Sequence, residues 1–156
     1  PVLLWMTGDD TTDALTPDER LFLLEYLWTG GSAIITGQNI AEYSPSGDTL
    51  LARTFGLEYG GNVVPFFIKG TEGDVIGDGV SYSFGGGAAN QSPPDRLRIT
   101  GGGSAQSTET LFYKYLISDT TETAAVRILG ENSRWTATFF AFGLEGGFCR
   151  RGVMSP

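Results

Sequence analysis

The chain has 156 residues, no histidine, and a net charge of -8 at pH 7 from 18 acidic and 10 basic side chains. This balance excludes sequence-independent nucleic acid binding, which needs Lys and Arg to displace counterions from phosphates. No apolar run approaches the roughly 20 residues that span a bilayer, so membrane insertion is not expected. The length predicts a single domain over residues 1–156.

The first forty residues predict a strand, a helix and a second strand. The apolar run 2–6 is typical of a buried strand. Thr16-Pro17-Asp18-Glu19 has the pattern of a capping box with Pro at the first helical position. The helix face predicted to be buried comprises Leu21, Leu23, Leu24, Leu27 and Trp28. Gly30-Gly31 ends the helix, and residues 33–35 begin a strand that should lie parallel to the first through a right-handed crossover.

Glycines divide the middle of the chain into short segments. There, residues 48–55 alone have the length of a helix. Short strands are predicted at 63–68 and 80–84, and Pro65 places the first of them at an edge or a bulge. Residues 85–110 are rich in Gly, Ser, Pro, Asn and Gln, which predicts a long surface loop with one strand at 97–99.

The last third is rich in aromatic and β-branched residues, which predicts strands. The predicted strands cover 111–117, 124–129 and 135–142. The last two should form a hairpin, because the five residues 130–134 suit a loop built on a type I turn. The pattern as a whole predicts an α/β sheet that is parallel at the start and antiparallel at the C-terminal end, with few helices and long Gly-rich loops.

Several segments carry a family resemblance over residues 1–45 and 63–151. They are Leu4-Trp5-Met6-Thr7-Gly8-Asp9-Asp10, Leu15-Thr16-Pro17-Asp18-Glu19, Tyr26-Leu27-Trp28-Thr29-Gly30-Gly31, Ile35-Thr36-Gly37-Gln38-Asn39-Ile40, Gly73-Asp74-Val75-Ile76-Gly77-Asp78-Gly79, Asn90-Gln91-Ser92-Pro93-Pro94-Asp95 and Phe142-Gly143-Leu144-Glu145. Together they resemble glutamine amidotransferase-like (class I, flavodoxin-like) domains related to ThuA proteins, especially those inside large secreted bacterial proteins such as peptidases. The resemblance implies a flavodoxin-like (Rossmann-like) sheet and an extracellular or cell-surface location.

The chain departs from that family in two respects. Amidotransferases need a Cys at the elbow between strand and helix, activated by a His, so that a thiolate attacks the glutamine amide. Here Gln38 or a neighbouring residue takes the elbow position and no His exists, so amidotransferase activity and catalytic residues of that kind are not expected. The family also has a further strand and helix before the first segment and a helix after the last. The resemblance therefore implies a domain truncated at both ends, or a sheet completed by another polypeptide.

Two acidic loops are candidate metal sites. The first contains Asp9, Asp10 and Asp13, and the second contains Glu72 beside the candidate ligands Asp74 and Asp78. Crowded carboxylates bind hard cations such as Ca²⁺, although neither spacing matches an EF-hand loop. The alternative is that these are solvated loop charges and helix-capping groups, in which case no cofactor is expected.

A candidate ligand-binding face comprises Asp9, Asp10, Gln38 and Asn39, at the tips of the two predicted parallel strands. The side-chain amides of Gln38 and Asn39 would recognise a ligand in one interpretation. In the alternative that we favour, they form hydrogen bonds with nearby backbone groups. The three tryptophans are predicted to be core, with Tyr43, Tyr59 and Tyr82 as candidate exposed rings. Cys149 lies beside Arg150 and Arg151, whose charge would favour the thiolate, but the chain offers it no base.

The function predicted from the sequence is a non-catalytic binding or structural accessory domain of a larger secreted bacterial protein. Its partners would be neighbouring domains of that protein or a second copy of the chain. One alternative is a carboxylate- or metal-dependent hydrolase that uses Asp9 or Asp10 with Glu42. Another is a purely architectural module, whose open sheet edge docks onto its neighbour and leaves a large exposed apolar patch on the isolated chain.

Overall fold

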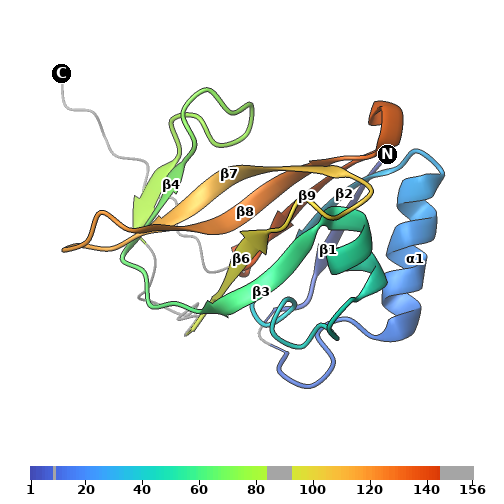
Figure 1. The fold of residues 1–156 in the computed structure, drawn as a ribbon, viewed down its shortest axis with the longest axis horizontal. Helices are drawn as coiled ribbons and strands as arrows, with labels where there is room; N and C mark the ends of the chain where they lie inside the picture. The colour runs from blue at the N-terminus through green and yellow to red at the C-terminus, as the bar shows by residue number, and fades with distance from the viewer. Residues whose placement is uncertain (9, 84–92, 145–156) are drawn as a thin grey trace.

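The computed structural model describes residues 1–8, 10–83 and 93–144, which form one nine-stranded sheet with a single α-helix beside it (Figure 1). The elements in chain order are β1 (Val2–Met6), α1 (Pro17–Trp28), β2 (Ser32–Thr36), the π-helix η1 (Thr49–Phe55), β3 (Leu57–Asn62), β4 (Phe67–Gly70), β5 (Ser81–Ser83), β6 (Asp95–Ile99), β7 (Gln106–Lys114), β8 (Thr121–Leu129), the 3₁₀ turn η2 (Glu131–Ser133) and β9 (Thr136–Phe140). No helix in these ranges is long and apolar enough to cross a membrane.

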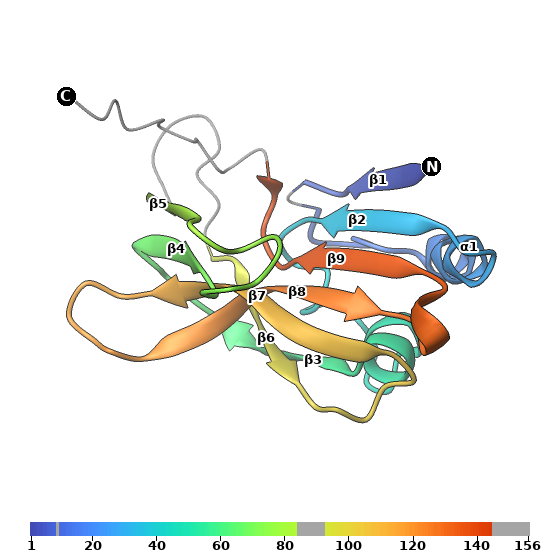
Figure 2. The same ribbon diagram turned by 90° about the horizontal axis from the view of Figure 1, so that it is seen from above.

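The sheet follows the order β1-β2-β9-β8-β7-β4-β5, and β3 and β6 branch from it through β8. The β1, β2 and β9 strands are parallel, whereas β8, β7, β4 and β5 continue antiparallel. This arrangement confirms the predicted α/β, flavodoxin-like sheet that starts parallel and ends antiparallel. Figure 2 shows that β1 and α1 lie at one end of the sheet, and that β4 and β5 lie at the other.

The N-terminus of α1 has the predicted capping box. The backbone N–H of Glu19 donates to the Thr16 hydroxyl oxygen at 3.3 Å, and the backbone N–H of Thr16 donates to Glu19 Oε2 at 2.8 Å. These bonds satisfy two donors that would otherwise lack partners at the helix start.

We expect Thr16→Ala to lower the free energy of unfolding by about 1 kcal/mol, because one backbone N–H of α1 loses its acceptor. Urea denaturation followed by far-ultraviolet circular dichroism measures the change. Thr12→Ala is the matched control, since Thr12 is exposed and precedes the helix. Equal midpoints for the two variants would contradict a stabilising cap at Thr16.

The buried face of α1 differs in part from the prediction. Leu23, Leu24 and Leu27 are buried as expected, but Leu21 and Trp28 are 52% and 59% exposed. Arg20 is the fourth buried residue of α1, and it lies on the same helix face as Leu23, three residues later. Its side chain donates to Leu15 O and Ser44 Oγ and pairs with Asp48 at 3.2 Å. An anchored arginine thus takes the core-facing position expected of an apolar residue.

Residues 2–6 form the predicted strand, but the expected burial holds for one face of β1 and not for the other. Leu3 and Trp5 pack against the core beneath α1, but Val2, Leu4 and Met6 are 65%, 56% and 50% exposed. Alternate side chains of a strand point to opposite faces of the sheet, so α1 can cover only one of the two sets. Among the described strands, β1 pairs with β2 alone and therefore lies at the sheet edge.

The middle of the chain follows the prediction less closely. The strand predicted at 63–68 is replaced by β3 and β4, with residues 63–66 joining them, and the helix predicted at 48–55 is η1, capped by the Asp48 carboxylate. Residues 84–92, the centre of the predicted long loop, lie outside the described residues. The strand predicted at 97–99 begins at Asp95, and β7 starts within the predicted loop. The β8–β9 hairpin is confirmed.

Two apolar cores lie on opposite faces of the sheet. The first joins α1 and η1 to the inner residues of β2, β8 and β9. It contains Trp135, whose ring centroid lies 6.1 Å from that of Phe55 with the two rings tilted by 43°. The second lies around β4, β7 and β8, with Ile68 and Tyr113 fully buried. The prediction of core tryptophans holds for Trp135 and in part for Trp5, but not for Trp28.

Candidate functional site

The carboxyl ends of β1 and β2 meet at one end of the sheet, as the sequence predicted. Met6 lies opposite Thr36, and the pairing continues beyond both strands, because the Thr7 N–H donates to Thr36 O and the Gln38 N–H donates to Gly8 O. A side chain at position 37 would collide with the Thr7 hydroxyl, which explains the glycine there. The chain then enters turns at residues 38–43 rather than the helix that the resemblance implied.

The structure brings Asp10 and Asn39 together. The Asn39 side-chain amide donates to the backbone oxygen of Asp10 at 3.3 Å, and Asn39 has a left-handed φ of 71°. Both Gln38 and Asn39 are more than nine-tenths buried, so their amides lie mainly within the protein. Gln38 Oε1 has no hydrogen-bond partner within the described residues. Asp9, the fourth predicted member of this face, lies outside those residues.

The candidate metal ligands lie in two separate loops. Asp10 Oδ1 accepts the N–H groups of Thr12 and Asp13 at 2.8 and 3.4 Å, as in an Asx turn. Asp78 Oδ1 accepts the N–H of Gly73 at 3.3 Å in the other loop. In the described ranges no three acidic or thiol side chains are grouped as a metal would need. Calcium binding in either loop stays a prediction.

Asp74 is instead bound by the protein on both carboxylate oxygens. Oδ1 accepts the N–H groups of Ile76 and Gly77 at 3.0 Å and the Thr110 hydroxyl, and Oδ2 accepts two guanidinium N–H groups of Arg127 at 3.2 and 3.3 Å. Burial on its own would raise the pKa of Asp74, but these hydrogen bonds outweigh it and lower the pKa to about 2. The carboxylate fixes the β4–β5 loop to β7 and β8.

Asp95 is a buried acid that sequence reasoning did not single out. It is the first residue of β6 and is fully buried, and its Oδ2 accepts the N–H groups of Ala41 and Glu42 at 2.9 and 3.0 Å. Its Oδ1 has no hydrogen-bond partner among the residues described. Burial raises the pKa of Asp95 to about 6 despite these N–H donors, and the charge of Glu42 adds to the rise.

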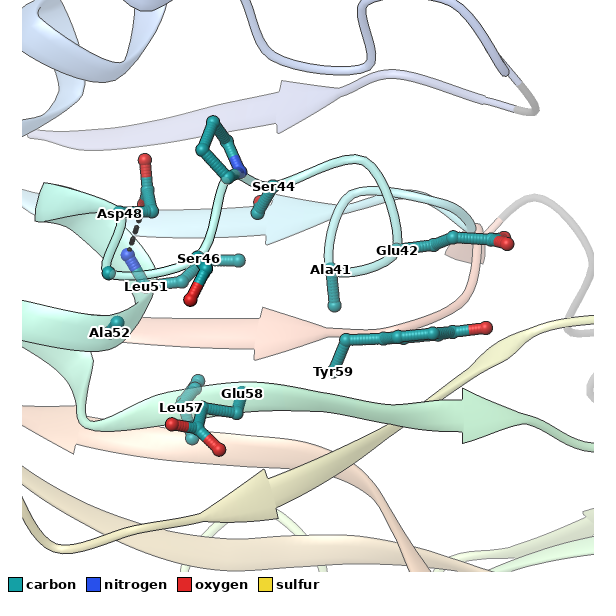
Figure 3. A pocket seen from close by; sticks show the side chains of 12 residues that line it. Ala41, Glu42, Ser44, Ser46, Asp48, Leu51, Ala52, Leu57, Glu58 and Tyr59 are labelled. Atoms are coloured by element: carbon teal, nitrogen blue, oxygen red, sulfur yellow. Dashed lines mark hydrogen bonds between the residues drawn. The ribbon is translucent and has the colours of Figure 1, made fainter.

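Beside Asp95 lies an acidic pocket of about 270 Å³ between the 41–48 loop, η1 and β3 (Figure 3). Its carboxylates are Glu42, Asp48 and Glu58. Its apolar lining includes Leu51 and Leu57. Figure 3 shows Glu42 and Tyr59 extending in the same direction at one end of the pocket. Burial, and then the charges of Glu42 and Asp95, raise the pKa of the Tyr59 phenol.

The arrangement places Glu42 among other acidic groups. Glu42 Oε2 accepts the Asn62 amide at 3.2 Å, and Asp95 has no solvent-exposed surface from which to reach a substrate. The predicted hydrolase with Asp9 or Asp10 and Glu42 stays a prediction. Tyr43 is 47% exposed, as expected, whereas Tyr59 is half-buried. The side chain of Tyr82 and residues 145–156, including Cys149, lie outside the described residues.

The fold and the strand tips together define an α/β domain with a flavodoxin-like sheet. No family model and no curated protein matches the chain. A β-galactosidase from Rahnella sp. R3 is similar over 90% of this chain and 19% of its own, with a TM-score of 0.51 and 10% sequence identity. A carbohydrate deacetylase, Agd3, aligns over 85% of this chain and 19% of its own, with a TM-score of 0.49 and 15% identity.

The chain thus spans about a fifth of the length of each of these two structures. At 10% identity, the likeness to the β-galactosidase shows a shared fold and nothing about activity. The resemblance to glutamine amidotransferase-like domains stays a prediction from the sequence.

Proposed function

We propose that this chain is a non-catalytic accessory domain of a larger secreted bacterial protein, and that it docks onto a neighbouring part of that protein through β1. The observation that carries the proposal is the exposure of Val2, Leu4 and Met6, at 65%, 56% and 50%, on an edge strand. The secreted bacterial setting rests on the family resemblance described above.

The outer edge of β1 offers both backbone and side-chain groups to a partner. Within the described residues, β1 has a strand neighbour on one side alone, so its other side presents backbone N–H and C=O groups. Proteins usually protect such edges with Lys, Pro or a bulge. Residues 2–6 are Val-Leu-Leu-Trp-Met, with no charge and no proline, and β1 pairs with β2 without a register shift.

These features define the chemistry of the partner. An extended apolar segment that adds a strand beside β1 would satisfy the backbone edge, and its own side chains on the same face would pack beside the three exposed ones. Exposed Asp10 and Asp13 follow the strand, so a Lys or Arg at that end of the segment would complement them. We therefore expect an uncharged strand with a basic end, supplied by the neighbouring domain.

The tips of β1 and β2 support the non-catalytic part of the proposal. The residues at the elbow are Gln38 and Asn39, whose side chains are buried, and the chain has no His to activate a nucleophile. The amide of Asn39 holds the Asp10 loop in place. This geometry suits a rigid scaffold for the β1 edge.

In the absence of its partner, β1 should pair with β1 of a second copy. We expect the isolated chain to associate as its concentration rises from about 5 to 200 μM, and Leu4→Lys to suppress the association because a buried Lys at the interface is costly. Light scattering after size-exclusion chromatography measures the mass. Val75→Lys is the matched control, since Val75 is 83% exposed in the β4–β5 loop.

A wild-type chain that stays monomeric over this range would contradict the proposal, as would equal suppression by the two lysine variants. Hydrogen exchange of the β1 amides provides a second measurement. These amides should be more protected at high concentration than at low concentration in the wild type, and should show no such difference in Leu4→Lys.

A further inference from the structure

The two lysines of the chain, Lys69 and Lys114, line the same pocket. This lysine pocket has a volume of about 290 Å³. Its lining residues come from β4, β5 and the end of β7, and Figures 1 and 2 show β4 at the end of the sheet that is farthest from α1. The residues that line it are Phe67, Lys69, Ser81, Lys114, Tyr115 and Leu116.

Strand register places the two lysines on one face. Phe67 of β4 lies opposite Lys114 of β7, while Lys69, two residues further along β4, lies opposite Ser81 of β5. Directly paired residues share a face of a sheet, as do residues two apart, so both ammonium groups stand on the same side. The intervening Ile68 points to the other side, where it is fully buried.

The charge of this pocket contrasts with that of the molecule. The chain carries a net charge of -8, yet the described residues that line the pocket include two cations and no carboxylate. Across the described residues the four ion pairs are all made by arginines, and neither lysine takes part in one. The nearby Glu122 carboxylate is already bound by Arg96 and by the Tyr115 hydroxyl. Within the described part of the chain, both ammonium groups are therefore available to an anion.

The rest of the lining is apolar or carries hydroxyl groups. Phe67 and Leu116 provide apolar contact, and Ser81 provides a hydroxyl donor. Leu116 and Ile117, at the tip of the β7–β8 hairpin, are 58% and 100% exposed and extend the apolar surface. Ligand sites commonly combine an apolar lining with a few convergent polar groups, and about 300 Å³ is the lower end of their range.

We propose that the lysine pocket binds a small molecule that joins an oxyanion, such as a carboxylate or a phosphate, to an apolar body. The ammonium groups of Lys69 and Lys114 bind the oxyanion, and the Ser81 hydroxyl donates a further hydrogen bond. The apolar body lies against Phe67 and Leu116. This site is separate from the β1 edge, and its existence does not depend on the docking proposed there.

Titration with benzoate and with phenyl phosphate, followed by amide chemical shifts in NMR spectra, tests the proposal. Both anions should cause saturable shifts at residues 67–69, 81 and 112–116. Neutral benzamide should cause none of comparable size, because it has the ring without the charge. Inorganic phosphate should bind more weakly than phenyl phosphate, since it lacks the apolar body.

Charge-matched variants locate the site. Replacing one lysine, as in Lys69→Gln or Lys114→Gln, should weaken benzoate binding by roughly tenfold, and the double variant should abolish saturation. Arg134→Gln removes one positive charge from an exposed position in the β8–β9 turn and should leave binding unchanged. Circular dichroism confirms that each variant is folded.

Three results would overturn the proposal. They are benzamide binding as tightly as benzoate, an unchanged affinity in the folded double lysine variant, and an equal loss in Arg134→Gln. The last result would mean that the anions respond to the overall charge of the protein rather than to this pocket.

Discussion

Replacing Asp74 with alanine is expected to lower the free energy of unfolding by about 3 to 5 kcal/mol, because it leaves buried and partly buried partners of a carboxylate without an acceptor. Those partners are the Ile76 and Gly77 N–H groups, the Thr110 hydroxyl and the Arg127 guanidinium. Denaturant unfolding at pH 7 measures the loss. Asp78→Ala is the matched control, since Asp78 is exposed in the same loop and accepts a single N–H group.

The contribution of Asp74 should disappear in acid. Its pKa is lowered from 3.8 to about 2 in the folded state, so its charge contributes stability that is present above about pH 4 and lost as the pH falls through 2. The shift corresponds to about 2 kcal/mol. Asp74→Asn keeps the shape without the charge, so its deficit relative to the wild type should shrink between pH 4 and pH 2. A deficit that is constant over this range would contradict the assignment.

The parts of the fold that the sequence predicts are those with local signals. The capping box at Thr16 and the glycines at 30 and 31 mark the ends of α1 without reference to the rest of the protein. The β8–β9 hairpin is likewise predicted from two apolar runs and a short polar connection. Each of these signals lies within a few residues of the feature that it predicts.

The features that were missed depend on contacts between distant segments. An apolar run such as 2–6 reads the same at the edge of a sheet as at its centre, so the exposure of Val2, Leu4 and Met6 follows only from the strand order. The buried face of α1 was predicted incorrectly at Arg20, because the ion pair that allows this arginine to be buried is made with Asp48, 28 residues further along the chain. The lysine pocket also requires the β4–β7 register, which pairs Phe67 with Lys114, 47 positions away.

The candidate site divides in the same way. Proximity of Asp10 and Asn39 could be predicted, because parallel neighbouring strands bring their carboxyl ends together. The turn after Gln38 could not be told from a helix start by its composition. The sequence around Asp95 indicates a special role only weakly, through an acidic residue that begins a strand directly after two prolines. Its hydrogen bonds from the N–H groups of residues 41 and 42 depend on the branching of β6 from the main sheet and could not be predicted.

Asp95 should make the protein less stable as the pH rises from about 4 to about 6, opposite in sign to Asp74. Its pKa is raised from 3.8 to about 6, so the protonated form is favoured in the folded state. The stability from this proton is fully present below about pH 4 and is lost as the pH rises through 6, a change of about 3 kcal/mol. The charged group that acts on it is Glu42, and Asp95 in turn acts on the Tyr59 phenol.

Asp95→Asn separates the charge of this residue from its role as an acceptor. The amide oxygen can still accept the Ala41 and Glu42 N–H groups, so we expect this variant to lack the loss of stability between pH 4 and pH 6 and to be more stable than the wild type at pH 7. Asp95→Ala removes the acceptor and should be destabilised at every pH. Denaturant unfolding at pH 4, 5, 6 and 7 measures all three proteins.

Parallel pH profiles for the wild type and Asp95→Asn would contradict a raised pKa at this residue. If the profiles diverge, we expect protonation of Asp95 to affect the acidic pocket as well, because its carboxylate accepts hydrogen bonds from residues 41 and 42 in the pocket wall. The amide resonances of Ala41 and Glu42 should then titrate near pH 6 in the wild type and stay fixed in Asp95→Asn. Protonation of Asp95 would then change both the free energy of unfolding and the hydrogen bonds of residues 41 and 42 beside the strand tips.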